Sequence, residues 1–248
     1  MEVKNNKAMD FLLYSYFGIE DQIEPNNDEN RTSVGIKCAY RAYQDLARTV
    51  KYTYSTSKLD NMSKKSAKEK EQKQAKEYKD SKVNLIENIC SQIIKQIYDE
   101  NINDFNEWHN NKCNFIITTM ENAENSGVKV VEKFTYGQAQ KWINMTLKYL
   151  WLLDLLPKSI NEKDIHVPVD GYIIEAATYN CSNHGDKLEN GLKITLDITK
   201  TPWSDWENLK DYQKFQEQII KQISGKYNSS IEWESKAWIE VAKKHAKK

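Results

Sequence analysis

The strongest local signals of this 248-residue chain lie in residues 133–177, which have the sequence KFTYGQAQKWINMTLKYLWLLDLLPKSINEKDIHVPVDGYIIEAA. Within it, Thr135 is followed three residues later by Gln138, which is the capping-box pattern of a helix N-terminus. A helix is therefore expected to begin at about Tyr136 and to run through the leucine-rich sequence before Pro157. Most of the remaining chain is expected to pack around this helix.

Two ionisable residues of the stretch are expected near helix N-termini. Lys141 follows the start of the first helix closely, where the helix dipole and partial burial both favour a neutral amine, which is a nucleophile. After a polar loop the chain is expected to become helical again at Tyr172. Asp170 then lies at the N-terminus of this second helix, a position that stabilises an ionised carboxylate.

These residues resemble the helix-hairpin-helix superfamily of DNA glycosylases. In that family a catalytic lysine follows the hairpin, and a segment such as Val-Pro-Val-Asp follows the helix of the lysine. Lys141 and the four residues from Val167 to Asp170 match this order, and a second lysine, Lys148, makes the pattern most similar to the archaeal type of 8-oxoguanine DNA glycosylase. The hairpin departs from the family, because its usual Leu-Pro-Gly-Val-Gly is reduced to Phe134-Thr135-Tyr136-Gly137.

The resemblance implies a mainly α fold of two helical lobes around a cleft, and excision of an oxidised base from DNA. It implies that Lys141 attacks the sugar and forms an imine, that strand cleavage follows, and that Asp170 stabilises the developing positive charge. Lys148 is the second candidate nucleophile. The partner is then DNA with a damaged or modified base, and we expect no cofactor and no metal. Contacts to substrate or DNA are expected from Gly137, Pro168, Tyr172, Arg41, Arg48, Trp203 and Trp206.

We place the boundary between the lobes near residue 132, with the catalytic segment and the C-terminal helices after it. Apolar residues at helical spacing predict further helices, and we place them within residues 1–24, 34–52, 83–98 and 103–120, from 202 to 225 and from 229 onward. Gly127 is expected to end the fourth of these helices. Ser204 with Glu207 reads as a second capping box, and Trp238 and Ile239 are expected to face inward.

Three segments are not expected to be ordinary buried helices. The run from Pro25 to Asn30 has the composition of a loop. The lysine-rich residues 55–81 have hardly any apolar side chains, so they fit a solvated helix or a mobile linker. Alternating apolar and polar residues at 192–199 predict a strand, and because no partner strand is evident, we expect at most a short β insertion there.

Arg31, Arg41 and Arg48 are the only arginines of the chain. Arg41 and Arg48 are seven residues apart and therefore share one face of an expected helix. One interpretation is that their planar guanidinium groups recognise phosphate or carboxylate. The alternative is a structural salt bridge with an acid such as Asp45.

Other side chains also have two interpretations. An aromatic ring at Trp203 or Trp206 fits stacking on an extruded base, or equally a place in the core. His109 and Cys113 have the spacing of two metal ligands on a helix, but no third ligand is evident, which favours packing. The four cysteines form no Cys-x-x-Cys pair.

The formal net charge of zero disfavours strong nonspecific binding to DNA, which depends on neutralised phosphates. No apolar run is long enough for a membrane helix, and no signal peptide is evident, so we expect a cytoplasmic protein that does not bind membranes. Two alternatives therefore remain beside the DNA repair enzyme. One is the same fold acting on a free nucleoside, a nucleotide or a modified phage base in a defence system. The other is a noncatalytic module that binds nucleic acid or protein.

Overall fold

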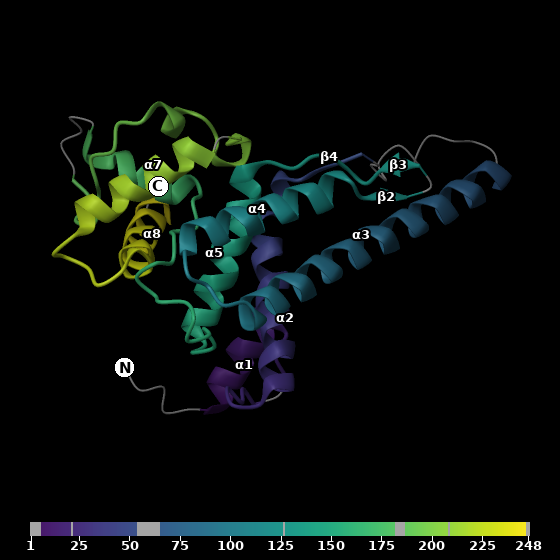
Figure 1. Ribbon diagram of the computed structural model, residues 1–248. Helices are drawn as coiled ribbons and strands as arrows, with labels where there is room; N and C mark the ends of the chain where they lie inside the picture. Colours follow the sequence, from purple (N-terminus) through teal and green to yellow (C-terminus); the bar gives the residue numbers. More distant parts are fainter. Residues whose placement is uncertain are drawn as a thin grey trace.

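The computed structural model describes residues 6–20, 22–53, 65–125, 127–181, 187–207 and 209–246. The protein is mainly α-helical, as predicted, with eight α-helices and two small antiparallel sheets of two strands in these residues (Figure 1). None of the helices described there is long and apolar enough to cross a lipid bilayer.

Helix α5 (Tyr136–Leu152) lies at the centre of the fold. The predicted capping box is present, because the Thr135 hydroxyl accepts from the Gln138 N–H and the Gln138 side chain accepts from the Thr135 N–H. Every residue of α5 from Tyr136 to Leu147 is buried. A helix that is buried on all sides must be covered by several neighbours, and this explains its central position.

Two helices from the first half of the chain pack directly on α5. They are α2 (Asp28–Leu46) and α4 (Phe105–Glu121). The indole N–H of Trp142 on α5 donates to the carbonyl oxygen of Ala39 on α2 at 2.9 Å. Thus α5 follows residue 132 in sequence but is tied closely to the helices that precede it.

Helix α3 (Lys65–Asp99) is the longest, and its first part projects from the body of the molecule (Figure 1). Its second part packs on α2 and α4. The predicted apolar stripe is buried there, and its fully covered members are Ile86, Ile89, Ile93, Ile94 and Ile97. Of the lysine-rich segment 55–81, residues 65–81 are helical, whereas residues 54–64 lie outside the described residues.

The strands flank the start of α5. Strand β1 (Lys51–Tyr52) pairs with β4 (Val131–Lys133), and Lys51 lies opposite Lys133. Strand β2 (Glu124–Asn125) pairs with β3 (Val128–Lys129) in a small hairpin. The first pair joins the end of α2 to the residues just before α5, so it fixes where α5 begins.

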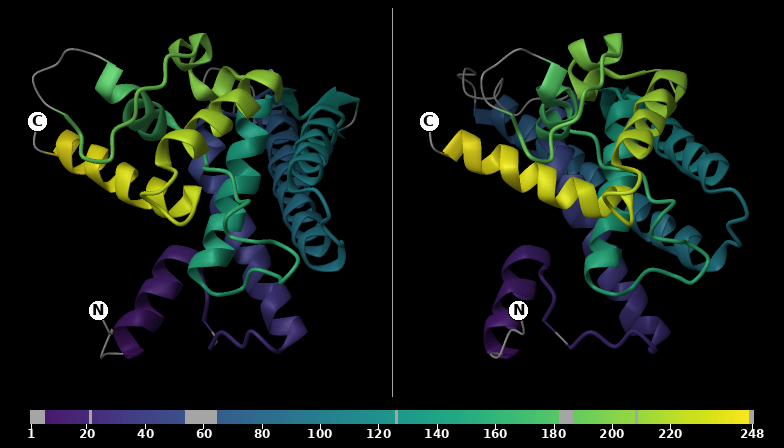
Figure 2. Two further views of the ribbon diagram at one scale, coloured as in Figure 1. Left: turned by 60° about the vertical axis from the view of Figure 1, so that its left-hand side comes forward. Right: turned by 90° about the vertical axis from the view of Figure 1, so that its left-hand side faces the viewer.

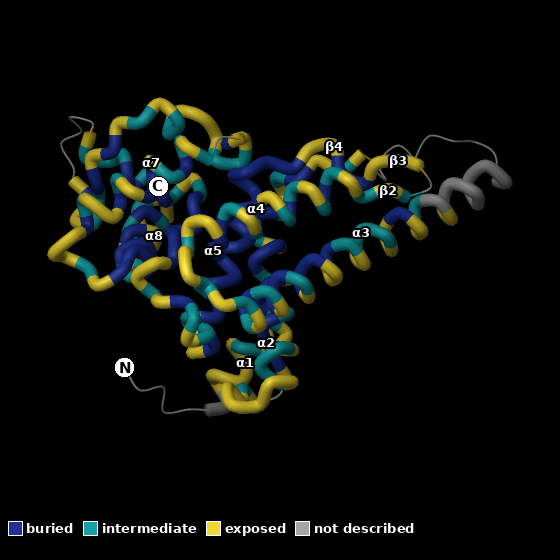
Figure 3. Tube along the Cα trace, in the orientation of Figure 1, coloured by how far each residue is buried: buried dark blue, intermediate teal, exposed yellow. Residues whose placement is uncertain are grey.

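The remaining helices lie at two ends of the molecule. Helices α6 (Gly171–Thr178), α7 (Leu209–Ile223) and α8 (Ser230–Ala246) form the C-terminal group, in which α8 packs on both others. Helix α1 (Asn6–Phe17) packs at one end of α2, away from that group (Figure 2). Burial is concentrated around α5, while α1 is largely exposed (Figure 3).

The predicted strand at 192–199 is wrong. The N–H groups of Leu192 and Ile194 donate to the carbonyl oxygens of Ala176 and Ala177, in the last turn of α6. The final carbonyl groups of a helix have no partner inside that helix. This segment supplies their donors, and residues 197–200 then form a short 3-10 helix, η4 (Asp197–Lys200).

Two helix starts also differ from the prediction. Helix α2 begins at Asp28, inside the expected loop, because Asn27 caps it and accepts from the Asn30 N–H. The helix expected from Pro202 is instead a short 3-10 helix, η5 (Trp203–Asp205), and α7 begins at Leu209. The carbonyl oxygens of Ser204 and Trp206 accept from the Thr135 hydroxyl and the Gly137 N–H at the start of α5. Ser204 lies in η5, before α7 begins, so it does not cap that helix.

Other boundaries were also placed wrongly. Helix α2 ends at Leu46 and is followed by the 3-10 helix η1 (Ala47–Thr49). Helix α4 ends at Glu121, and Gly127 instead has a φ of 78° in the β2–β3 turn, a conformation that suits glycine. Trp238 and Ile239 of α8 do not face inward, since they are 37% and 49% exposed.

Candidate functional site

The segment from His166 to Val169 is a buried, extended piece of chain without a partner strand. Side-chain amides of neighbouring helices satisfy its backbone instead. Gln140 of α5 bonds to both the N–H and the carbonyl of Val169, and Gln216 of α7 does the same for Val167. Proline has no N–H, so Pro168 between them needs no acceptor. This arrangement fixes the residue that follows, Asp170.

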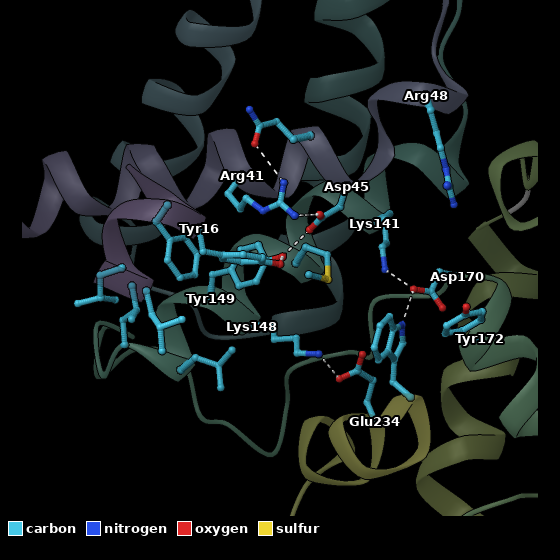
Figure 4. Close-up of a pocket in the computed structure, with 18 of the residues that line it drawn as sticks. Tyr16, Arg41, Asp45, Arg48, Lys141, Lys148, Tyr149, Asp170, Tyr172 and Glu234 are labelled. Carbon is cyan, nitrogen blue, oxygen red and sulfur yellow. Dashed lines mark hydrogen bonds and ion pairs between the residues drawn. The ribbon is translucent and has the colours of Figure 1, made fainter. Parts of the chain in front are cut away.

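Asp170 is the N-cap of α6, as predicted, and it also meets Lys141. Its Oδ1 accepts from the Ile173 N–H at 3.0 Å, and its Oδ2 lies 2.8 Å from Lys141 Nζ (Figure 4). The indole N–H of Trp238 donates to the same oxygen at 3.2 Å. Two side chains separated by 29 positions in sequence are thereby joined in one ion pair.

Asp170 is held in its ionised form. Burial raises the pKa of its carboxyl, but the charge of Lys141 and the hydrogen bonds from Lys141, Ile173 and Trp238 outweigh burial, so the pKa lies below its ordinary value. Lys141 must present an unprotonated amine to act as a nucleophile, and a neutral resting form of this amine stays a prediction.

Lys141 and Asp170 both line a cavity of about 980 Å³. The side chain of Lys141 is only 5% exposed and that of Asp170 is 19% exposed. One part of the wall is apolar and comes mainly from α1 and the end of α5, with Met9, Leu12, Leu13, Phe17, Leu152 and Leu153. The ion pair therefore lies at the surface of a space that is large enough for a nucleoside.

A second ion pair, between Lys148 and Glu234, lines the same cavity. Lys148 Nζ lies 2.5 Å from Glu234 Oε2, and the Glu234 side chain is only 1% exposed (Figure 4). Burial raises the pKa of Glu234, and the charge of Lys148 offsets this only in part. Glu234 was not among the site residues predicted from the sequence. A signal was present, since Glu234 occupies a position between Ile231 and Val241 in the apolar stripe of the last helix.

Arg41 forms a salt bridge with Asp45, which was the structural alternative to phosphate binding. Its guanidinium group lies 2.9 Å from the carboxylate of Asp45, donates to Gln44 and lies over the ring of Tyr16. The Tyr149 hydroxyl donates to the same Asp45 carboxylate. Arg48 also lines the cavity but takes no part in this cluster.

Three of the predicted contact residues do not line the cavity. The backbone N–H of Gly137 donates to the carbonyl of Trp206 at 2.8 Å, so it is not free for a phosphate. Trp206 is 2% exposed and donates to the Thr201 carbonyl, which makes it a core residue. Pro168 is buried behind Asp170.

Aromatic rings form the wall beside Asp170. Tyr172 and Trp203, both predicted, line the cavity together with Trp238. The ring of Tyr172 packs 5.1 Å from that of Trp238 and is stacked on His245. Rings at such a wall offer faces on which a planar base can stack.

His109 and Cys113 lie in the core, away from the cavity. The Cys113 sulfur is 3.8 Å from the His109 ring nitrogens, and His109 bonds to Asn144 of α5. Within the described ranges, no three metal-binding side chains come together. His166 and Tyr212 complete this buried polar cluster.

No protein-family model matches this chain, and no curated protein or solved structure matches it either.

Proposed function

We propose that this protein is an 8-oxoguanine-type DNA glycosylase with AP lyase activity, in which Lys141 is the nucleophile and Asp170 its electrostatic partner. The observation that carries the proposal is the 2.8 Å contact between Lys141 and Asp170 at the wall of a cavity of about 980 Å³. A contact between a lysine and an aspartate that each belong to the start of a helix is also what the resemblance to helix-hairpin-helix glycosylases implies.

The proposed reaction begins when Lys141 gives a proton to solvent water and the lone pair of its nitrogen bonds to C1′ of the sugar. The glycosidic bond breaks, its electron pair goes to the base, and the departing base takes up a proton. Asp170 stays ionised and stabilises the positive charge that develops on the sugar. Opening of the ring, with a proton added to the ring oxygen, gives an imine between Lys141 and C1′. Loss of a proton from C2′ to solvent water and departure of the 3′ phosphate with its electron pair then form a C2′–C3′ double bond and cut the strand.

The lining of the cavity supports a nucleoside as the bound group. Tyr172, Trp203 and Trp238 supply aromatic faces for an extruded base, and base extrusion is the general route by which enzymes reach a base in a duplex. Asp170 and Glu234 are both engaged in ion pairs, so the choice of an oxidised purine as the substrate follows from the resemblance to the 8-oxoguanine enzymes.

Trapping with borohydride tests the proposal. The protein is mixed with a duplex that contains 8-oxoguanine and, separately, with a duplex that contains an abasic site, and sodium borohydride is added. We expect a covalent adduct with wild type and none with Lys141→Gln. Lys148→Gln tests the second candidate nucleophile. Lys200→Gln is the matched control, because Lys200 is exposed and does not line the cavity. Equal adduct from Lys141→Gln and wild type would refute the assignment.

One observation favours the alternative of a small substrate. The Gly137 N–H, which would hold a DNA phosphate in the family, is bonded to Trp206 instead. The neutral net charge agrees with weak DNA binding. Release of base from free 8-oxodeoxyguanosine or its monophosphate, measured by chromatography, together with no adduct on duplex DNA, would favour this second function. No reaction with any of these substrates would favour the noncatalytic module.

A further inference from the structure

The charges that line the cavity are paired, with one exception. Its cations are Arg41, Arg48, Lys141 and Lys148, and its acids are Asp45, Asp170 and Glu234. Three ion pairs combine them, at 2.9 Å for Arg41 with Asp45, 2.8 Å for Lys141 with Asp170 and 2.5 Å for Lys148 with Glu234. Among the described residues, Arg48 remains without an acidic partner.

The backbone of Arg48 is held in place, while its side chain is exposed and makes no ion pair with a described residue. It lies in η1, and the next residue, Thr49, accepts hydrogen bonds from the Gln138 side chain through both its carbonyl and its hydroxyl. Gln138 belongs to the first turn of α5, the same helix that carries Lys141. The backbone at Arg48 is therefore tied to the backbone that positions the proposed nucleophile.

The guanidinium group of Arg48 is directed toward the part of the cavity where Lys141, Asp170 and Tyr172 lie (Figure 4). Arg41, which also lines the cavity, already binds Asp45 and Gln44. Both terminal nitrogens of Arg41 are thus engaged, whereas Arg48 makes no ion pair with a described residue. A guanidinium group presents several N–H donors in one plane, which matches the oxygens of a phosphate.

We propose that Arg48 is the phosphate-binding residue of this cavity, and that it holds the phosphate attached to the nucleotide whose sugar reaches Lys141. Arg48 is exposed, so its guanidinium group stands at the rim of the cavity, where an incoming phosphate can reach it. The phosphate belongs to a free nucleotide or to the backbone of a strand. The identity of the reacting sugar rests on the proposed function, whereas binding of the phosphate requires no reaction.

Binding measurements test the role of Arg48 and separate the two sources of phosphate. Calorimetry compares 8-oxodeoxyguanosine with its 5′-monophosphate, and fluorescence anisotropy follows a labelled duplex that contains an abasic-site analogue. If the source is a free nucleotide, wild type binds the monophosphate about tenfold more tightly than the nucleoside, and Arg48→Gln removes this difference. If the source is a strand, Arg48→Gln weakens duplex binding about tenfold, and the weakening shrinks in high salt.

Two variants serve as controls. Arg48→Lys keeps the charge and is expected to recover part of the affinity. Arg31→Gln changes the only arginine outside the cavity, which pairs with Asp28, and is expected to leave both affinities unchanged. Arg48→Gln with unaltered affinity for both probes would overturn the inference, as would a wild type that binds neither. Failure of the proposed function would appear differently, as intact binding without any trapped adduct.

Discussion

Lys148 of α5 and Glu234 of α8 form an ion pair, with 2.5 Å between Nζ and Oε2, that links the central helix to the C-terminal group. Glu234 is almost fully buried, and Lys148 is 15% exposed. Two charges in such a place stabilise each other, but neither is well solvated if the other is removed. This pair and the contact between Lys141 and Asp170 both line the same cavity (Figure 4).

Removal of one member of this pair is expected to lower the free energy of unfolding more than removal of both members. Lys148→Met leaves a buried carboxylate without its cation and should lower the free energy of unfolding by about 3 kcal/mol. The double variant Lys148→Met with Glu234→Met leaves no buried charge and should recover most of that loss. Urea unfolding at pH 7 measures both. A double variant no more stable than Lys148→Met would contradict this account.

Asp170→Asn is expected to lower stability by about 2 kcal/mol at pH 7, because Lys141 loses its counterion. Asparagine remains a good N-cap, so α6 should persist. The pKa of Asp170 in the folded state lies below its ordinary value of 3.8, so the carboxylate stabilises the protein above that pH and this stabilisation is lost as the pH falls. Urea unfolding at pH 7, 5 and 3 should therefore show that the free energies of unfolding of wild type and Asp170→Asn approach each other as the pH falls. A difference that widens toward pH 3 would be inconsistent with it.

The buried histidines are expected to make the protein sensitive to acid. Burial lowers the pKa of His109 to about 4 and that of His166 well below its ordinary value of 6.5. The unfolded chain then binds protons that the folded chain does not, so stability is complete above about pH 6.5 and falls as the pH drops toward 4. Each histidine contributes a slope of up to about 1.4 kcal/mol per pH unit.

Unfolding free energies between pH 7 and 4 measure this slope. His166→Gln should reduce it, since glutamine binds no proton in either state. His245→Gln is the control, because His245 is 40% exposed and pairs with Glu175 at the surface. A wild-type slope that His166→Gln leaves unchanged would show that other groups cause the acid sensitivity.

Two glycines give opposite predictions for substitution by alanine. A Cβ at Gly137 would lie 1.8 Å from the backbone oxygen of Trp203, so Gly137→Ala must push η5 away from α5 and should cost about 3 kcal/mol or more. A Cβ at Gly171 meets nothing within 4 Å. Gly171→Ala should be neutral or stabilise by up to about 1 kcal/mol. Thermal unfolding distinguishes the two, and similar melting temperatures would refute the close approach.

Much of the fold was predictable from local patterns. The capping box at Thr135 and Gln138 marked the start of α5, and isoleucines at helical spacing marked the buried face of α3. The strand predicted at 192–199 was wrong for a reason that alternation cannot reveal. Its N–H groups bond to the exposed end of α6, and that end becomes their neighbour only in the folded chain.

The candidate site divides in the same way. Lys141 and Asp170 were candidates from the sequence, because each lies near the start of a predicted helix and because the segment from Val167 to Asp170 resembles a glycosylase motif. The role of Glu234 and the difference between Arg41 and Arg48 could not be predicted from the sequence, because they depend on which charged side chains form ion pairs in the folded chain. Arg41 has Asp45 four residues away on its own helix, whereas whether Arg48 has a partner depends on all the segments around the cavity.

The amino-acid sequence alone determined the helical class, the central helix and the cap at Asp170, because caps and helical periodicity act over a few neighbouring residues. Only the tertiary structure decided that Lys141 and Asp170 lie 2.8 Å apart, that Lys148 is joined to Glu234 and that the Gly137 amide is occupied. Contacts between distant segments depend on how whole helices pack, and packing is set by the shapes and volumes of many side chains together.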